Sequence, residues 1–127
     1  MGSTEKNVYT YFSDKKLRKK LKSDDTPKVI ESGKQGKHIK GHNNYIEGNS
    51  YLTVSETEAQ ELVNKYAGTG DIKRDSKGRW TNKEFVTADK KIGVVVDSES
   101  GKETSTARFS IHYSRKGVHI VPRKEID

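Results

Sequence analysis

The chain has 127 residues, of which 29% are hydrophobic and 34% are charged, so it is long enough for one compact domain with a lean core. It contains no cysteine, which excludes disulfide bonds and thiolate metal sites as sources of stability. No apolar run is long enough for a membrane span or for the hydrophobic part of a signal peptide.

The formal net charge of +7 is concentrated towards the N-terminus. Residues 1–40 carry 11 Lys or Arg against 5 Asp or Glu, whereas residues 41–127 carry 14 against 13. A basic arm of this kind attracts polyanions, nucleic acid first, through neutralisation of phosphate charge. It fits a solvated linker from a larger parent protein equally well.

The basic arm offers little apolar surface. Its central stretch, SDKKLRKKLK (13–22), places only Leu17 and Leu21 on one helical face, too few to hold a helix in isolation. We therefore expect residues 1–32 to form a flexible arm and residues 33–127 to form the functional domain.

Residues 33–48, GKQGKHIKGHNNYIEG, are rich in glycine, asparagine and lysine, which favours an extended loop with short strand pieces over a helix. The glycine between His38 and His42 disfavours a helical metal pair, and no cysteine or nearby acid would complete a zinc site. Lysines alternate with glycine here, an arrangement suited to phosphate because it combines free backbone amides with ammonium groups. The alternative is an ordinary solvated basic loop.

The middle of the chain predicts one helix followed by strands. Residues 55–66, SETEAQELVNKY, begin with a Ser-x-x-Glu capping box and place apolar residues at helical spacing. After a helix stop at Gly68, the chain reaches a turn-like DSKG segment and Trp80, a candidate core anchor. Residues 92–97, IGVVVD, are a β-branched run typical of a buried strand.

The C-terminal part predicts a β-hairpin. One long strand, ETSTARFSIHYS (103–114), alternates apolar and polar residues, and SRKG (114–117) forms a loop in which Gly117 takes a positive φ. The resulting register pairs Tyr113 with Val118, Ile111 with Ile120, and His112 with His119. Both apolar pairs then reach the core together, whereas a shift of one residue would mix the two faces, so the hydrophobic pattern selects this register.

His112 and His119 are thereby predicted to be neighbours on the polar face, with Cβ atoms about 5 Å apart. Two imidazoles so close disfavour double protonation, so one accepts a proton near pH 7 while the other donates one, as general acid–base catalysis requires. Arg108, Ser110 and Thr106 fall on the same face. The alternative is an exposed sheet face that carries two histidines without a catalytic role.

Four motifs follow one another along the chain: KQGKHIKGHNNY (34–45), LVNKYAGTG (62–70), WTNKEFV (80–86) and STARFSIHYSRKGVHIVP (105–122). Together they resemble the bacterial polymorphic toxin type 50 domain over about residues 33–123, with Lys40 standing where the family pattern has proline. The resemblance implies an α+β fold of the barnase, EndoU, colicin and RelE group, in which a helical part precedes an antiparallel sheet of about four strands. Family members are C-terminal toxin modules of large secreted proteins and of phage minor head proteins.

The resemblance also implies a metal-independent endoribonuclease toxin that cleaves RNA by 2′-OH transesterification and leaves a 2′,3′-cyclic phosphate. In this implied site His38 and either His112 or His119 transfer protons, while Arg108 and the remaining histidine hold the phosphate. Substrate contacts would come from Lys34, Lys37, His42, Thr106, Ser110 and Ser114. No metal or other cofactor is expected.

The expected partners are an RNA substrate and an immunity protein, acidic so that it covers the cationic site. We expect a monomer without membrane contacts, delivered as a secreted or phage-associated effector that acts in the cytoplasm of a target cell. Two alternatives stay open: a non-catalytic nucleic-acid-binding module of a phage head-associated protein and, less favoured, a metal-dependent nuclease.

Overall fold

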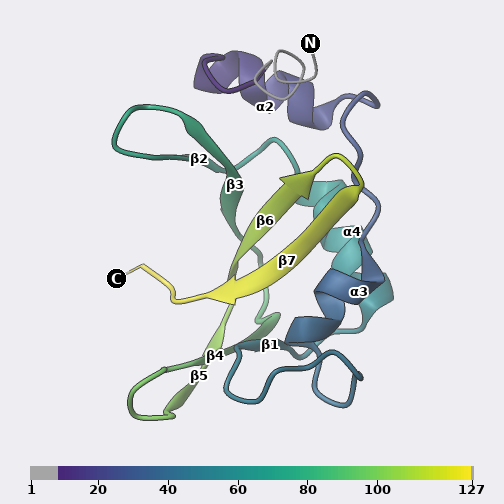
Figure 1. Cartoon of the computed structure of the whole chain (residues 1–127), viewed down its shortest axis with the longest axis vertical. Coiled ribbons are helices and arrows are strands. Elements are labelled where there is room, and N and C mark those ends of the chain that lie inside the picture. Colours follow the sequence, from purple (N-terminus) through teal and green to yellow (C-terminus); the bar gives the residue numbers. More distant parts are fainter. Residues whose placement is uncertain (1–8, 127) are drawn as a thin grey trace.

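The computed structural model describes residues 9–126. In chain order the elements are α2 (Asp14–Lys22), α3 (Ser32–Gln35), the 3-10 helix η1 (Gly36–His38), β1 (Tyr51–Leu52), α4 (Glu56–Tyr66), β2 (Asp71–Arg74), β3 (Trp80–Thr87), β4 (Gly93–Val96), β5 (Glu103–Thr106), β6 (Arg108–Ser114) and β7 (Gly117–Arg123). They form a four-stranded antiparallel sheet, β2-β3-β6-β7, and a three-stranded antiparallel sheet, β1-β4-β5 (Figure 1). The predicted α+β class is confirmed, and the small second sheet is an addition to it. No helix in the described range has the length and apolarity needed to cross a bilayer.

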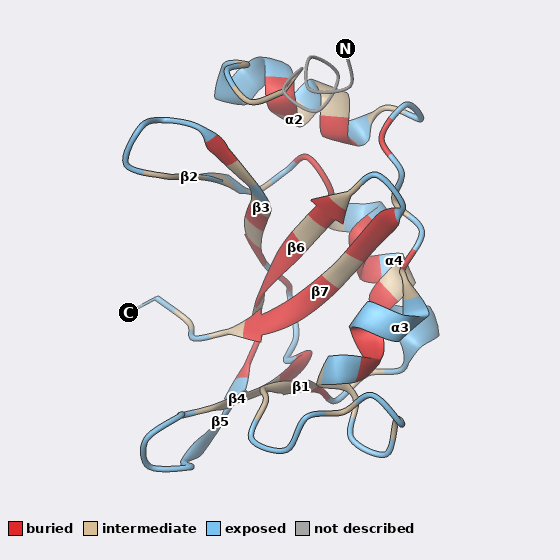
Figure 2. Ribbon diagram, in the orientation of Figure 1, coloured by how far each residue is buried: buried red, intermediate tan, exposed pale blue. Residues whose placement is uncertain are grey.

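The main core lies between α4 and one face of the four-stranded sheet. The predicted capping box is present, with Ser55 accepting from the backbone of Glu58, and it fixes the start of α4. The buried residues of α4 are Ala59, Leu62 and Val63. The ring of Tyr66 meets Phe109 of β6 edge-on, 6.1 Å between centroids, and the facing strands are largely buried (Figure 2).

The β6–β7 hairpin has the predicted register. Tyr113 pairs with Val118, Ile111 with Ile120, and His112 with His119. Gly117 takes a φ of 146°, and a Cβ at this position would lie 2.2 Å from the carbonyl oxygen of Val29. The glycine is therefore needed both for the turn and for the close passage of the chain before α3.

The long strand predicted over residues 103–114 is in fact two strands. It is interrupted at Ala107, so that β5 pairs with β4 of the small sheet while β6 pairs with β3 and β7. The Thr106 hydroxyl stabilises the break, because it accepts from the Arg108 backbone at 3.0 Å and donates to the Arg123 carbonyl at 2.6 Å. Alternation alone does not reveal such a break, since both strands keep the same period.

A buried carboxylate fixes the turn between α4 and β2. Glu84 is fully buried and accepts three hydrogen bonds, from the backbone amides of Gly68 (3.0 Å) and Gly70 (2.7 Å) and from the Tyr113 hydroxyl (2.6 Å). Burying a carboxylate costs little only when its lone pairs are satisfied in this way. The AGTG segment therefore serves as a backbone cradle for Glu84.

The expectation of a flexible arm does not hold for α2. Leu17 and Leu21 are fully buried, and Arg18 donates to the carbonyl of Gly70 at 2.7 Å. The two leucines are too few for an isolated helix, but they suffice here because the helix packs on the existing core. Residues 1–8 of the predicted arm lie outside the described residues.

The loop predicted over residues 33–48 is partly helical. α3 and η1 occupy its first residues, where an extended chain was expected, and turns follow. Gly36 permits this compact path, since a Cβ there would lie 2.2 Å from the ring of His42. Trp80, by contrast, is the buried anchor that was predicted.

Replacing Glu84 by glutamine tests the backbone cradle. The amide group can accept only at its oxygen, so one buried backbone donor is left facing an NH2 group, and we expect the free energy of unfolding to fall by about 2 kcal/mol. Urea denaturation measures the loss. The matched control is Glu61→Gln on the exposed face of α4, which should leave the midpoint unchanged; equal midpoints for the two variants would contradict the role of Glu84.

Candidate active site

The face of the four-stranded sheet opposite α4 carries three rows of side chains that run across the strands. His119, His112 and Lys83 form the first row, Val121, Ser110, Phe85 and Asp71 the second, and Arg123, Arg108 and Thr87 the third. The strand alternation that sends the apolar residues to the core sends these side chains to the other face.

Three of the four histidines meet at the first row. The rings of His112 and His119 lie 4.5 Å apart between centroids, as the predicted register required. His38, from η1, lies parallel to His119 at a tilt of 8°, with 6.4 Å between the centroids. The nitrogen atoms lie at the edges of the rings, so a hydrogen-bonding group would be bound at these edges and not between the ring faces.

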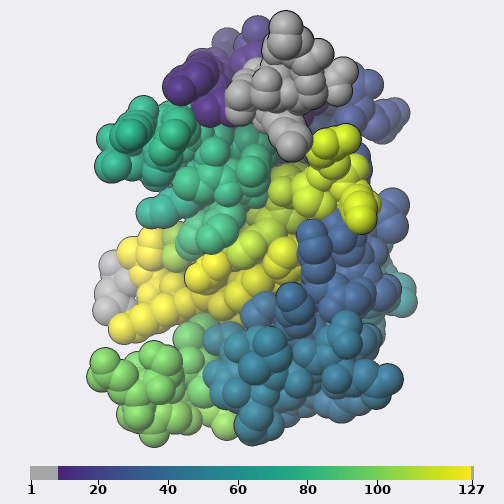
Figure 3. All heavy atoms as spheres, in the orientation of Figure 1, coloured from purple at the N-terminus to yellow at the C-terminus, as the bar shows by residue number. Residues whose placement is uncertain are grey.

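Gln35 determines where His38 lies. Its buried side-chain amide accepts from the Ile120 backbone at 2.8 Å and donates to the Ile120 carbonyl at 2.9 Å, so it pairs with β7 as a strand residue would. η1 begins at the next residue, which holds His38 over the neighbouring His119. In the space-filling view, the yellow C-terminal strand accordingly adjoins the blue segment that carries α3 and η1 (Figure 3).

Hydrogen bonds define the tautomers of two of these rings. His38 Nδ1 lies 2.9 Å from the Ser50 carbonyl, which can only accept, so Nδ1 carries the hydrogen and Nε2 is free to accept a proton. Arg123 Nε donates to Ser110 Oγ at 2.9 Å, and the Ser110 hydroxyl in turn lies 2.8 Å from His112 Nε2. His112 Nε2 is therefore the acceptor at the end of a chain of donors that starts at Arg123.

The environment favours the neutral form of all three imidazoles. Burial, followed by the charges of His119 and Arg123, lowers the pKa of His112 to about 3. Burial, followed by the charges of His38 and Lys34, lowers the pKa of His119 to about 4. Burial also lowers the pKa of His38, although its bond to the Ser50 carbonyl opposes this shift. Fixed cations and desolvation act in the same direction here.

One carboxylate adjoins the histidines. Glu31 is held against β7 by its backbone amide, which donates to the Val118 carbonyl at 2.8 Å. Its carboxylate accepts from Ser114 Oγ at 2.5 Å and lies 3.5 Å from Lys34 Nζ; the Ser114 bond is the main cause of the lowered pKa of Glu31. Ser114 thus contacts Glu31 rather than pointing towards the gap between the rings.

Several predicted site residues lie elsewhere or have another task. Thr106 stabilises the strand break, and His42 packs on Gly36 while its Nδ1 accepts from the Asn44 backbone. Arg108 stands in the third row, two rows from the histidines, and its guanidinium lies over the ring of Phe85 in the second row. Lys34 and Lys37 are near enough for their charges to lower the pKa of His119.

The sequence analysis did not identify Arg123, Glu31, Gln35, Lys83 or Phe85. Arg123 could have been found, because extending the predicted hairpin register by three pairs places it opposite Arg108. The positions of Glu31 and Gln35 depend on contacts between distant segments, for which local pattern gives no signal.

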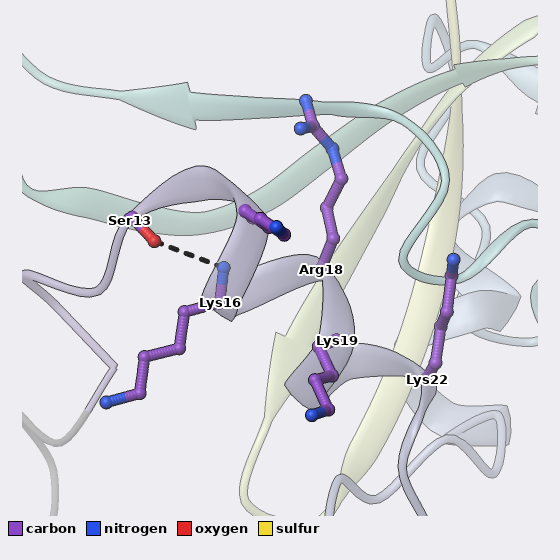
Figure 4. A pocket seen from close by; sticks show the side chains of 6 residues that line it. Ser13, Lys16, Arg18, Lys19 and Lys22 are labelled. Atoms are coloured by element: carbon purple, nitrogen blue, oxygen red, sulfur yellow. Dashed lines mark hydrogen bonds between the residues drawn. The ribbon is translucent and has the colours of Figure 1, made fainter.

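A second cationic surface lies on α2, apart from the histidines. It borders a hollow of about 560 Å³ lined by Ser13, Lys15, Lys16, Arg18, Lys19 and Lys22. Figure 4 shows that the side chains of Lys16, Lys19 and Lys22 spread in different directions instead of converging on one point. Within residues 9–126, no three His, Asp or Glu side chains are gathered in a way that could hold a metal ion.

The lowered histidine pKa values predict that acid destabilises the fold. In the unfolded chain these groups titrate near 6.5, whereas in the folded chain His112 and His119 titrate near 3 and 4. The unfolded state therefore binds more protons, and the free energy of unfolding should fall as the pH drops from 6.5 towards 4. Urea denaturation at a series of pH values measures this slope.

The matched control is the double variant His112→Asn/His119→Asn, in which the dependence between pH 6.5 and 5 should be much weaker. A wild-type slope that survives in this variant would contradict the assignment. NMR titration of the histidine Cε1–H signals provides an independent measurement of each pKa.

Comparison with known proteins places the chain in a family. The family model described as Bacterial toxin 50 matches residues 30–122, a range that includes η1, α4, β2, β3, β6 and all of β7 except its last residue, Arg123. No curated protein matches the chain. Because the family model covers well over half of the 127 residues, the chain belongs to the Bacterial toxin 50 family.

Proposed function

We propose that this domain is a metal-independent endoribonuclease toxin that cleaves RNA by attack of a ribose 2′-OH on the adjacent phosphate. The observation that carries the proposal is the meeting of His38, His112 and His119 from two distant segments, with 6.4 Å between the His38 and His119 rings. A phosphodiester bound at the nitrogen-bearing edges of these rings would have one imidazole near the 2′-oxygen and another near the 5′-oxygen. General acid–base catalysis requires this placement.

His38 is the proposed base. Its Nδ1 hydrogen is held by the Ser50 carbonyl, which leaves Nε2 to accept the 2′-OH proton. The 2′-oxygen then bonds to phosphorus while the bond from phosphorus to the 5′-oxygen breaks. His119, across the gap, donates a proton to the departing 5′-oxygen. The products are a 2′,3′-cyclic phosphate and a 5′-hydroxyl end.

Arg123 is the proposed cation for the phosphate. It is half-buried, it contacts His112 Nε2 at 3.4 Å, and its bond to Ser110 fixes its direction. A fixed guanidinium stabilises the added charge of the pentavalent phosphate without having to reorganise. The resemblance implied that Arg108 holds the scissile phosphate; we assign this role to Arg123, which pairs with Arg108 across the hairpin.

The substrate and partners follow from the same surface. A single-stranded RNA or a loop is favoured, because the 2′-OH must swing into line with the departing oxygen. An acidic immunity protein would match the cations around the histidines and neutralise them. Acting as a monomer, the domain would reach RNA in the cytoplasm of a target cell as a secreted or phage-delivered effector.

Passive nucleic-acid binding is the second candidate. It is favoured by the lysines of α2, whose side chains spread in different directions (Figure 4) around a hollow that no histidine lines. In this case α2 would bind the phosphate backbone of the nucleic acid, and the histidines would not take part in catalysis.

Incubating the purified domain with a single-stranded RNA in EDTA distinguishes these functions. We expect cleavage to a 2′,3′-cyclic phosphate, and His38→Ala and His119→Ala should each lower the rate by about 10²- to 10⁴-fold because each removes one proton transfer. Lys77→Ala, in the exposed turn between β2 and β3, is the control and should retain activity. RNA retained intact supports passive binding, and cleavage that appears only after Mg²⁺ is added supports a metal-dependent nuclease.

A further inference from the structure

The two arginines of the third row, on the sheet face opposite α4, both contact one aromatic ring. Arg108 Cζ lies 4.7 Å and Arg123 Cζ 5.5 Å from the centroid of Phe85, and the two arginines are direct partners across β6 and β7. Phe85 belongs to the second row, opposite Ser110, so both guanidinium groups lean along the sheet towards the histidines. Two guanidinium groups, one from β6 and one from β7, thus lie close together beside the proposed cleavage site.

These two arginines have no acidic partner among residues 9–126. Arg74 and Arg79 each contact a carboxylate, Asp14 at 2.7 Å and Asp75 at 2.8 Å, whereas Arg18 and Arg115 also have no described acidic partner but do not adjoin a second arginine in a shared contact. Burial and the charge of Arg108 instead lower the pKa of Arg123. Two neighbouring guanidinium groups without a carboxylate repel each other, and a bound anion would remove that repulsion.

Arg108 has most of its donors free. The only described hydrogen bond of its guanidinium is a long one, 3.4 Å from Nη1 to the Lys124 carbonyl, whereas the guanidinium of Arg123 is already engaged with Ser110 and His112. The contact with the Phe85 ring favours this position of the guanidinium and uses none of its N–H donors. The planar N–H edge of a guanidinium suits a phosphate group, which it can bind through two parallel hydrogen bonds.

The distance along the strand separates Arg108 from the scissile phosphate. Arg108 stands four positions before His112 on β6, which corresponds to about 13 Å between their Cα atoms. The guanidinium of Arg123, from the same row, reaches His112 Nε2 at 3.4 Å, whereas that of Arg108 has no described contact with a histidine, so Arg123 is assigned the phosphoryl group at the histidines and Arg108 remains available for another. The ligand must therefore carry a second negative group further along the same molecule.

We propose that Arg108, whose guanidinium lies over the Phe85 ring beside Arg123, binds the phosphate that neighbours the scissile one in the RNA strand. This inference rests on the proposed ribonuclease function and adds a second phosphate subsite to it. The domain then requires more than one phosphate for full activity and prefers oligonucleotides to a dinucleoside monophosphate.

The first test compares kcat/KM for a dinucleoside monophosphate and for the same molecule with an extra phosphate at its 5′ or 3′ end. The wild type should cleave one of the two longer substrates about tenfold better, the effect of one added charge-assisted phosphate contact. Arg108→Gln should reduce this ratio to about one, and Arg108→Lys should restore it only in part because an ammonium cannot stack or bind in a fork. Arg115→Gln, which removes an exposed charge from the same hairpin, should keep the wild-type ratio.

The second test does not need cleavage. Binding of a short RNA whose 2′-OH groups are replaced by hydrogen is followed by fluorescence anisotropy at several salt concentrations. Losing one phosphate contact should reduce the slope of log K against log salt by about 0.7 in Arg108→Gln, but not in Arg115→Gln.

The outcomes separate the two proposals. If no substrate is cleaved but the slope changes as expected, the phosphate subsite stands and the ribonuclease function fails. If cleavage occurs with a ratio of one in the wild type, or if Arg108→Gln and Arg115→Gln behave alike in both tests, the subsite is wrong. Circular dichroism and thermal melting of each variant verify that the fold is intact.

Discussion

The pairing of apolar residues across the β6–β7 hairpin is the constraint on which the whole candidate site depends. Ile111 and Ile120 are fully buried as a facing pair, and moving either strand by one residue would expose both. The period of two then leaves His112 no position except opposite His119. The packing of the core face thus determines which side chains are neighbours on the face opposite α4. No separate interaction is needed to bring the rings of His112 and His119 together.

A second constraint brings in the third histidine. The Gln35 side chain occupies both backbone groups of Ile120, and residues 30 and 118 form a parallel bridge just before it. Because Ile120 is also a core residue, the segment that carries His38 is coupled to the same strand that carries His119. The gap between the two rings therefore forms only when the sheet and the segment before it have both folded.

Local pattern predicted the hairpin, the helix with its capping box and the anchor Trp80, because each depends on residues near one another in sequence. It missed the burial of α2, since two leucines give no signal until a core exists for them to join. It also missed Gln35 and Glu31, whose partners lie more than 80 residues away. The position of His38 depends on these long-range bonds, so the sequence indicated that the histidine was a candidate but not where it would lie.

The proposed mechanism assigns charge and proton transfer to different residues. Burial and fixed cations keep His119 neutral in the free protein, so the attraction for phosphate must come from Arg123, Lys34 and Lys37. A phosphate that enters the gap places a negative charge beside the ring and raises its pKa, which favours the protonated form that an acid catalyst needs. By linkage, protonation of His119 and binding of the anion must then strengthen each other equally. Half-burial of the histidines is therefore not an obstacle to catalysis, because it makes the acid form depend on the presence of the substrate.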